Sequence, residues 1–253
     1  MMLVTGAASG LGRYLHESLG GQGLTRANAG EVIGRLRRTG ADIIIHAAFN
    51  PAKEVDGSLL YEYLRDNLFL TKEIASIPHK KFIFMSTIDV YTKDGRTHTE
   101  DEDINVNPAN GLYAMTKLMS EAIVRKRSAD YLIIRASALL GKYSRRNSLI
   151  KILENDGTEL TLSGGSRFNY VLHSDILEFI EIAAQTGLGG IYNAASSGDI
   201  TLGEAAAIAD RKVRFGGCEY DGGNVSGGKI AAVCPAFRKS SADVVREFIK
   251  ERG

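Results

Sequence analysis

The alternation of short apolar runs with longer amphipathic segments limits what this chain can fold into more than any other feature of its sequence. Five segments carry apolar residues at helical spacing, and most of them end near Gly or Pro: 11–19, 29–38, 59–76, 113–126 and 175–186. Six apolar runs flank or separate them, several with the low polar content of strands covered on both faces: 1–4, 23–25, 42–47, 81–86, 131–135 and 191–194. Strands that alternate with helices in this way predict β-α-β units. We therefore expect an α/β fold with a doubly wound parallel sheet.

This rhythm is interrupted twice by mixed polar, glycine-rich sequence. The interruptions cover residues 141–169 and the chain from residue 198 onward. A length of 253 residues corresponds to one or two domains. We expect a larger domain made of residues 1–140 and 170–197, and a smaller lobe, made of 141–169 and 198–253, that is interleaved with it.

Charge and cysteine content argue against several classes of function. The 31 Lys and Arg residues nearly balance the 30 Asp and Glu residues, so attraction to nucleic acid or to an anionic membrane is not expected. No leader peptide or membrane span is expected, because the apolar start runs into a glycine turn and the richest apolar run contains His46. Two distant cysteines, Cys218 and Cys234, fit a reducing compartment, by default the cytoplasm. The histidines lack metal-ligand spacing, and no metal is predicted.

A glycine-rich turn follows the first predicted strand and opens the first predicted helix. Gly6, Gly10 and Gly12 let the backbone approach a phosphate at the helix N-terminus, and Ser9 and Leu11 stand between them. The alternative is a tight strand-to-helix connection that binds nothing. The position of the turn directly after an N-terminal strand favours a phosphate cradle.

Two later segments carry groups suited to proton transfer. Tyr113 and Lys117 are four residues apart on a predicted helix, so the phenol and the ammonium share one face. A neighbouring cation lowers the pKa of a phenol, which makes Tyr113 a candidate general acid or base. Ser86 and Thr87 end the fourth strand, at the sheet edge where α/β folds bind ligands. A helix-surface pair and ordinary turn hydroxyls are the alternative interpretations.

In this order, these segments resemble the extended short-chain dehydrogenase/reductases, the NAD-dependent epimerase/dehydratase family of nucleotide-sugar enzymes. The resemblance covers nearly the whole chain and implies a Rossmann-type dinucleotide-binding domain with a substrate-binding lobe. It also includes, in order, His46-Ala47-Ala48, Asn67, Val90-Tyr91, Glu121, Ile134-Arg135, Gly141, Asn169 to Asp175 and Gly190 to Asn193.

The resemblance implies a catalytic role for three residues. Tyr113 would move a proton to or from a sugar oxygen while hydride passes to or from a nicotinamide. Lys117 would hold the cofactor ribose. Thr87 would hydrogen-bond the same substrate oxygen, and its neighbour Ser86 is a further candidate for contact with the substrate.

The cofactor is expected to be NADP rather than NAD. At the end of the second predicted strand, an acidic residue would bind the ribose hydroxyl of NAD, whereas Arg26, assisted by Arg13, suits the 2′-phosphate of NADP. A solvated helix-edge charge is the alternative for either arginine. Asn67 could equally be a buried amide that braces backbone. The cofactor-binding candidates are Gly6, Ser9, Gly10, Leu11, Gly12, Arg26, Ala47, Ala48, Asn67, Tyr113 and Lys117.

Two arginines of the lobe are candidate substrate-binding residues. Arg145 follows a glycine at a place where the family meets a nucleotide-sugar diphosphate, and Arg167 precedes the Asn169 segment. The phosphate-binding arginine of the family would fall at Phe168. A surface role for these arginines is therefore an equal alternative.

Departures from the family pattern narrow the expected reaction. The glycine spacing is that of the smaller, single-domain branch of the superfamily. Ile88 and Asp89 stand where the dehydratases carry Asp and Glu, which disfavours dehydration. The segment 89–95 is similar to that of reductases acting on 4-keto sugars.

We therefore expect an NAD(P)-dependent oxidoreductase or epimerase acting on a nucleotide-linked sugar by hydride transfer. The alternatives are a 4-keto-sugar or other carbonyl reductase of the same fold, and a non-catalytic dinucleotide-sensing protein. The family often pairs through two helices, here 59–76 and 113–126, so a homodimer is expected, although their apolar faces could equally be core.

Overall fold

The computed structural model describes residues 1–52, 55–106 and 111–252. These residues form two compact units, each of which is described by itself. The first contains residues 1–92, 103–135 and 186–192, and the second contains 93–102, 136–185 and 193–253. The domain boundaries expected from the sequence stay a prediction.

A six-stranded sheet forms the centre of the fold. Its strand order is β10-β5-β4-β3-β1-β2, and the β1–β2, β1–β3 and β3–β4 pairs are parallel. The strands are β1 (Met2–Thr5), β2 (Gln22–Leu24), β3 (Ala41–His46), β4 (His79–Thr87), β5 (Tyr131–Ala136) and β10 (Gly190–Ala194). The expected α/β fold with a parallel sheet is confirmed.

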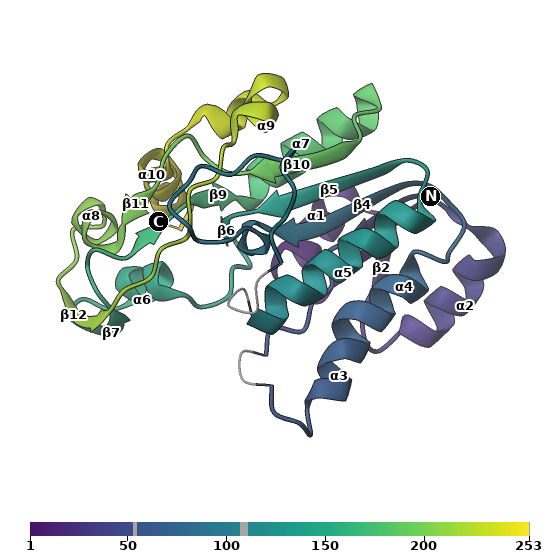
Figure 1. Ribbon diagram of the computed structural model, residues 1–253, viewed down its shortest axis with the longest axis horizontal. Helices are drawn as coiled ribbons and strands as arrows, with labels where there is room; N and C mark the ends of the chain where they lie inside the picture. Colours follow the sequence, from purple (N-terminus) through teal and green to yellow (C-terminus); the bar gives the residue numbers. More distant parts are fainter. Residues whose placement is uncertain (53–54, 107–110, 253) are drawn as a thin grey trace. The chain divides into compact units, whose positions relative to one another are not determined.

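Helices cover both faces of this sheet in the first unit. Because β2 and β3 lie on opposite sides of β1, right-handed crossovers place the connecting helices α1 and α2 on opposite faces. Figure 1 shows α2, α4 and α5 side by side on the near face. The helices of this unit are α1 (Gly10–Leu19), α2 (Ala29–Thr39), α3 (Leu60–Leu64), the π-helical segment η1 (Arg65–Phe69), α4 (Leu70–Ile74), the 3₁₀ turn η2 (Ile88–Val90) and α5 (Gly111–Arg127).

The strand order differs from the usual Rossmann order, 3-2-1-4-5-6, in which two strands lie beyond β1. Only β2 lies beyond β1 here, and the chain crosses back to β3 after it. The sheet therefore begins 2-1-3, and its topological switch point lies between the carboxyl ends of β1 and β3. Ligands of open α/β sheets bind at such switch points.

The core of the first unit explains why its strands lack polar alternation. Seven consecutive residues of β4, 81–87, are buried, since helices cover both faces of the strand. The core cluster joins strands to helices and includes Leu3, Val32, Leu36, Ile44, Ile74, Phe82, Phe84, Val124 and Ile133.

The second unit is built from short elements around its own core. Parallel pairs join β6 to β9 and β7 to β12, and an antiparallel pair joins β8 to β11. Its strands are β6 (Ala138–Leu140), β7 (Thr158–Leu162), β8 (Arg167–Phe168), β9 (Tyr170–Leu172), β11 (Ile200–Thr201) and β12 (Val213–Cys218). Its helices are α6 (Ser148–Glu154), α7 (His173–Thr186), α8 (Leu202–Ile208), α9 (Gly228–Val233), the 3₁₀ turn η4 (Pro235–Arg238) and α10 (Ser241–Arg252). The main core cluster includes Leu140, Leu149, Tyr170, Leu172, Val244 and Phe248.

No helix within residues 1–52, 55–106 and 111–252 is both long and apolar enough to cross a membrane.

Candidate active site

The glycine turn lies at the switch point of the sheet. Gly6 and Gly10 have φ values of 73° and 57°, a region that suits glycine. A Cβ on Gly6 would lie 3.0 Å from the Ala48 backbone, and one on Gly12 would lie 2.5 Å from the Gly6 carbonyl oxygen. The turn is therefore packed tightly between α1 and the segment after β3, and larger residues would open it.

This turn fits the pyrophosphate of a dinucleotide. It leads into the ten-residue helix α1, whose first residues are Gly10, Leu11, Gly12 and Arg13. The first N–H groups of a helix have no partner within the helix, and the helix dipole adds partial positive charge there. An anion can approach this end closely because the glycines carry no side chains.

A buried histidine braces the switch point from below. The ring of His46 shares hydrogen bonds with Thr5 Oγ1 at 2.7 Å and with Thr71 Oγ1 at 2.9 Å. Thr5 Oγ1 also accepts from the Ala48 N–H at 3.0 Å. Burial, and then the charge of Lys117, lower the pKa of His46 to about 3. A neutral imidazole thus ties β1, β3 and α4 together.

Asn67 holds the loop that follows β3. Its Oδ1 accepts from the Asn50 N–H at 2.7 Å, and its Nδ2 donates to the Asn50 carbonyl at 3.2 Å. Asn67 lies in the π-helical segment η1, a form often found at functional sites. Both the oxygen and the nitrogen of the Asn67 amide therefore bond to backbone, as a bracing role requires. These bonds fix the loop that carries Ala47 and Ala48.

Lys117 is buried where α5 meets β4. Its Nζ donates to the Met85 carbonyl at 2.7 Å, and the residue is only 6% exposed. The rings of Phe49 and Phe84 have centroids 4.7 and 4.9 Å from Nζ. Burial lowers the pKa of Lys117 to about 7, against the opposing charge of Glu121. The ammonium thus titrates near neutral pH.

Tyr113 lies one helical turn before Lys117 on α5. Its ring meets that of Phe49 edge to face, with the centroids 4.8 Å apart. Because Phe49 also lies against Lys117 Nζ, the phenol and the ammonium are on the same side of α5. The structure thus brings together the two side chains that the sequence placed on one helix face.

Thr87 ends β4, two residues after the carbonyl that holds Lys117. Its Oγ1 donates to Asp89 Oδ2 and accepts from the Asp89 N–H, both at 3.2 Å, which caps η2. Lys117 therefore links the helix of Tyr113 to the strand of Thr87, and the three candidate catalytic residues belong to one unit.

Ser86 takes part in a buried ionic network instead of facing outward. Its hydroxyl donates to Glu121 Oε1 at 2.5 Å, and Arg135 donates to the two carboxylate oxygens of Glu121 at 3.1 and 2.8 Å. Arg135 also donates to the Tyr91 hydroxyl at 2.8 Å. Burial disfavours the charged guanidinium, but its bonds to Glu121 outweigh this and raise the pKa of Arg135. The network joins β4, β5, α5 and the residue that follows η2, and it includes the neighbour of Thr87 in the chain.

Arg26 reaches from the end of β2 to η1. Its Nη2 lies 2.5 Å from Asp66 Oδ2, which also accepts from Asn50 Nδ2 at 3.1 Å. The Arg26 side chain is 78% exposed. Arg13, its expected assistant, instead pairs with Glu17 one turn along α1. The guanidinium of Arg26 thus stands beside the switch point but shares its charge with a carboxylate.

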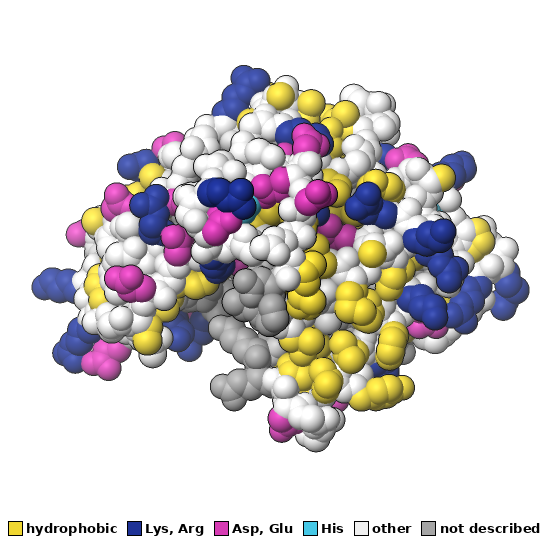
Figure 2. All heavy atoms as spheres, in the orientation of Figure 1, with side chains coloured by type: hydrophobic (Ala, Val, Ile, Leu, Met, Phe, Trp, Pro, Cys, Tyr) yellow, Lys and Arg dark blue, Asp and Glu magenta, His cyan; other side chains and the backbone are white. Residues whose placement is uncertain are grey.

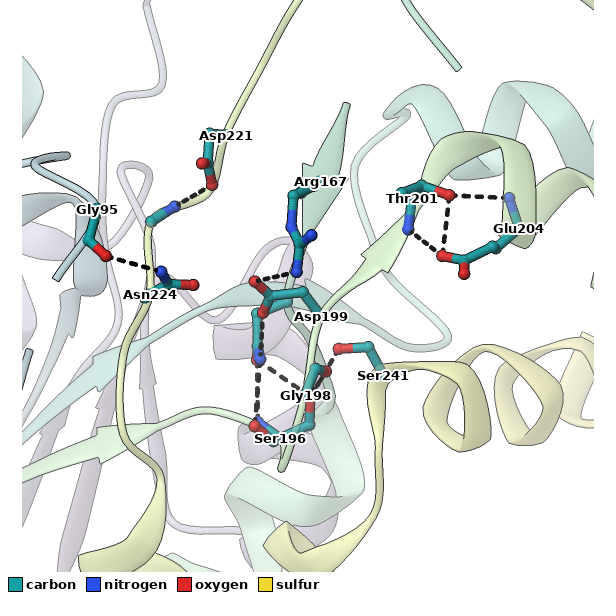
Figure 3. A network of polar contacts seen from close by, with 12 residues as sticks. Gly95, Arg167, Ser196, Gly198, Asp199, Thr201, Glu204, Asp221, Asn224 and Ser241 are labelled. Carbon is teal, nitrogen blue, oxygen red and sulfur yellow. Dashed lines mark hydrogen bonds and ion pairs between the residues drawn. The ribbon is translucent and has the colours of Figure 1, made fainter. Parts of the chain in front are cut away.

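The two candidate arginines of the lobe lie on the surface of the second unit. Arg145 is exposed, and Arg167 on β8 is 3.8 Å from Asp199, as Figure 3 shows. Asp199 also accepts from Asn169 Nδ2 at 3.1 Å. The ring of Phe168 stacks on that of Tyr170, with centroids 5.6 Å apart. These contacts hold β8 and its neighbours together within this unit.

No sequence signal marks Phe49, Met85 or Asp66 as part of the site. An apolar residue after a strand is typical of core packing, and a backbone carbonyl carries no sequence signal. Glu121 and Arg135 belonged to the resemblance, but their mutual contact appears only in the fold.

Comparison with known proteins identifies the family and the fold of the chain. The model of the NAD dependent epimerase/dehydratase family matches residues 2–195. The chain belongs to this family. The resemblance stated from the sequence is thereby confirmed. A search of the curated proteins gives no match.

Solved structures of similar fold cover nearly the whole chain. MoeE5 in complex with UDP-glucose and NAD has 16% identity and a TM-score of 0.81, covering 99% of this chain and 98% of that chain. A dTDP-4-dehydrorhamnose reductase from Clostridium acetobutylicum has 18% identity and a TM-score of 0.78, covering 98% of each chain. UDP-glucuronic acid 4-epimerase from Bacillus cereus has 17% identity and a TM-score of 0.78, covering 100% of this chain and 99% of that chain. At these identities the likeness establishes the fold.

Proposed function

We propose that this protein transfers hydride between a nicotinamide dinucleotide and a nucleotide-linked sugar, as an epimerase or a keto-sugar reductase. Family membership supports the reaction class. The observation that carries the proposal is the placement of Tyr113 and Lys117 around one aromatic ring, with Lys117 bonded to the strand that ends in Thr87.

In this proposal, Tyr113 moves the proton. To reduce a ketone, its hydroxyl donates a proton to the carbonyl oxygen, and in the reverse direction the phenolate accepts the proton of the sugar hydroxyl. The charged form of Lys117 stabilises that phenolate, because a nearby cation lowers the pKa of a phenol. Thr87 orients the same oxygen by a hydrogen bond. When bound, the dinucleotide supplies or accepts the hydride.

Dehydration is disfavoured in this proposal. Expulsion of a hydroxyl needs an acidic side chain that can protonate the leaving group. The residue directly after Thr87 is the apolar Ile88, which cannot supply that proton. The Asp89 carboxylate accepts from Thr87 Oγ1. Reduction and epimerisation need only the Tyr113 phenol, the Thr87 hydroxyl and the dinucleotide. A keto-sugar reductase is therefore the second candidate function, beside an epimerase.

We propose that the dinucleotide is NADP, because Arg26 offers a guanidinium beside the switch point. Its pairing with Asp66 limits this preference, since a carboxylate nearby repels a 2′-phosphate. Arg145 and Arg167 remain candidates for the diphosphate of the substrate. A location in the reducing cytoplasm stays a prediction. Its support is that the two cysteines, Cys218 and Cys234, are free.

We also propose that two copies pair through the helices of the first unit. Figure 2 shows hydrophobic side chains gathered over α3, α4 and α5. Tyr61, Phe69, Leu112 and Met119 are 68, 46, 37 and 50% exposed. Contiguous exposed apolar surface typically marks an interaction site. Light scattering would report the mass expected of two chains.

Tyr113→Phe tests the catalytic proposal. The purified protein is mixed with UDP- and dTDP-linked keto sugars and reduced dinucleotide, and loss of reduced nicotinamide is followed by absorbance. For the epimerase reaction, UDP- and dTDP-linked sugars that carry a hydroxyl in place of the ketone are incubated with oxidised dinucleotide, and the sugar products are separated by chromatography. The wild type should turn over at least one substrate, and Tyr113→Phe should abolish turnover while it binds dinucleotide normally. A variant with wild-type turnover would show that Tyr113 is not the proton carrier.

A further inference from the structure

Phe49 contacts both members of the proposed Tyr113–Lys117 pair. Its ring centroid is 4.7 Å from Lys117 Nζ and 4.8 Å from the centroid of Tyr113. It also meets the buried ring of Tyr63 edge to face, with the centroids 6.1 Å apart. Phe49 lies in the loop after β3, which Asn67 holds by both ends of the Asn50 backbone. The ring is thus held in place by its own stretch of backbone.

The Lys117 ammonium has a carbonyl oxygen and two rings as neighbours. One N–H donates to the Met85 carbonyl, and Nζ lies 4.7 and 4.9 Å from the ring centroids of Phe49 and Phe84. A ring face within about 6 Å of a cation attracts it. Phe84 is 1% exposed and belongs to the core, whereas Phe49 is half-buried. Phe49 is therefore the group that stands between Lys117 and water.

We propose that Phe49 is a positioning residue of the active site, which excludes water from the Lys117 ammonium and fixes its distance from Tyr113. The inference rests on the proposed function in taking Tyr113 and Lys117 as the reacting pair. Removal of the ring admits water to Nζ, and a solvated ammonium keeps its proton to higher pH. Replacement of the ring by an apolar side chain without a ring does not raise the pKa of Lys117. The ammonium then loses its attraction to the ring face but is still shielded from water.

The charged and titratable groups that face Lys117 support this reasoning. Glu121 on α5 favours the protonated amine, and burial, followed by the charge of Lys117, lowers the pKa of His46 on β3. Tyr113 lies across the Phe49 ring. Burial outweighs the carboxylate and lowers the pKa of Lys117, so a change in its access to water should dominate its titration.

The test measures Lys117 in the free protein, without cofactor or substrate. Wild type, Phe49→Ala and Phe49→Leu are labelled with acetic anhydride across a range of pH, and the Lys117 peptide is quantified by mass spectrometry. The wild-type midpoint should lie near neutral pH. In Phe49→Ala it should rise by about one pH unit or more. In Phe49→Leu it should stay at the wild-type value or fall.

The matched control is Phe215→Ala, which removes a 37% exposed phenylalanine from the second unit. Its Lys117 midpoint should equal that of the wild type. An unchanged midpoint in Phe49→Ala, or the same rise in Phe215→Ala, would overturn the proposal. A rise in Phe49→Leu would also overturn it, and this arm decides the question if Phe49→Ala does not fold.

A turnover assay run beside the labelling separates this inference from the proposed function. If Lys117 titrates as expected in all variants but no dinucleotide-dependent turnover occurs with any sugar, the proposed function fails, and the labelling shows only that Phe49 controls the access of water to Lys117. If turnover depends on Tyr113 and the Lys117 midpoint is the same with and without the ring, the proposed function stands and the positioning role fails.

Discussion

Loss of the Glu121 charge should destabilise the first unit far more than a typical surface substitution. The side chains of Glu121 and Arg135 are 5% and 4% exposed, and two hydrogen bonds join them. Glu121→Gln leaves the Arg135 charge without its partner, and breaking one half of a buried pair costs roughly 3–5 kcal/mol. Because Gln keeps one acceptor oxygen, we expect a loss of about 3 kcal/mol. At roughly 2–4 °C per kcal/mol for a chain of this size, Tm should fall by about 6–12 °C.

Urea unfolding followed by far-UV circular dichroism measures this loss directly. A double variant, Glu121→Leu with Arg135→Met, removes both charges and should recover most of the stability, since apolar replacements of buried pairs are often neutral. A third variant, Glu17→Gln, breaks the exposed pair with Arg13 and should cost under about 1 kcal/mol. If Glu121→Gln loses no more than Glu17→Gln, the network does not hold β4, β5 and α5 together as argued.

Three further predictions concern pH, the glycine turn and the cofactor. The pKa of His46 is about 3 in the folded protein, below its unfolded value. The free energy of unfolding should therefore decrease as the pH is lowered from about 6.5 toward 3, by roughly 2 kcal/mol at pH 5. In His46→Gln, the urea midpoints at pH 7 and pH 5 should differ less than in the wild type. Gly12→Ala places a Cβ 2.5 Å from the Gly6 carbonyl and should weaken dinucleotide binding at least about tenfold by calorimetry, whereas Gly34→Ala, in open space on α2, should bind normally. Arg26→Ala should weaken NADP binding about tenfold and leave NAD binding unchanged, and equal losses for both would refute a role in cofactor choice.

The first unit could be predicted largely from the sequence because its patterns are long. Seven consecutive buried residues in β4 and seventeen helical residues in α5 leave few alternatives, and their expected ranges differ from the observed ones by only a few residues. The second unit could not be predicted in this way. Strands of two or three residues, such as β8 and β11, are too short to show a period, and their partners are distant in sequence.

The strand order could not be predicted from the sequence, for a different reason. Both 3-2-1 and 2-1-3 arrangements contain the same alternation of strands and helices, so only tertiary pairing decides between them. The helix expected over residues 59–76 has the same limit. It is observed as α3, η1 and α4, and the π-helical segment in its middle coincides with the bonds from Asn67 to Asn50. Such bonds depend on a loop that no helical pattern describes.

The candidate site was predictable where function fixes residue type, and not where it depends on packing. Tyr113, Lys117 and Thr87 stand at recognisable spacings. Ser86 shares the sequence signature of Thr87, yet its hydroxyl is bonded to Glu121 within the network. One residue of difference along a strand reverses the face on which a side chain lies.

The three-residue strand β2 leaves little free backbone at one margin of the sheet. It is the outer strand on one side of the sheet, and the length of such a strand sets how many unpaired backbone groups it offers to another chain. Three residues offer very few, which makes strand-to-strand aggregation along this margin unfavourable. If copies pair as proposed, this margin of the sheet contributes little to the contact, and the side chains of the helices would carry its specificity.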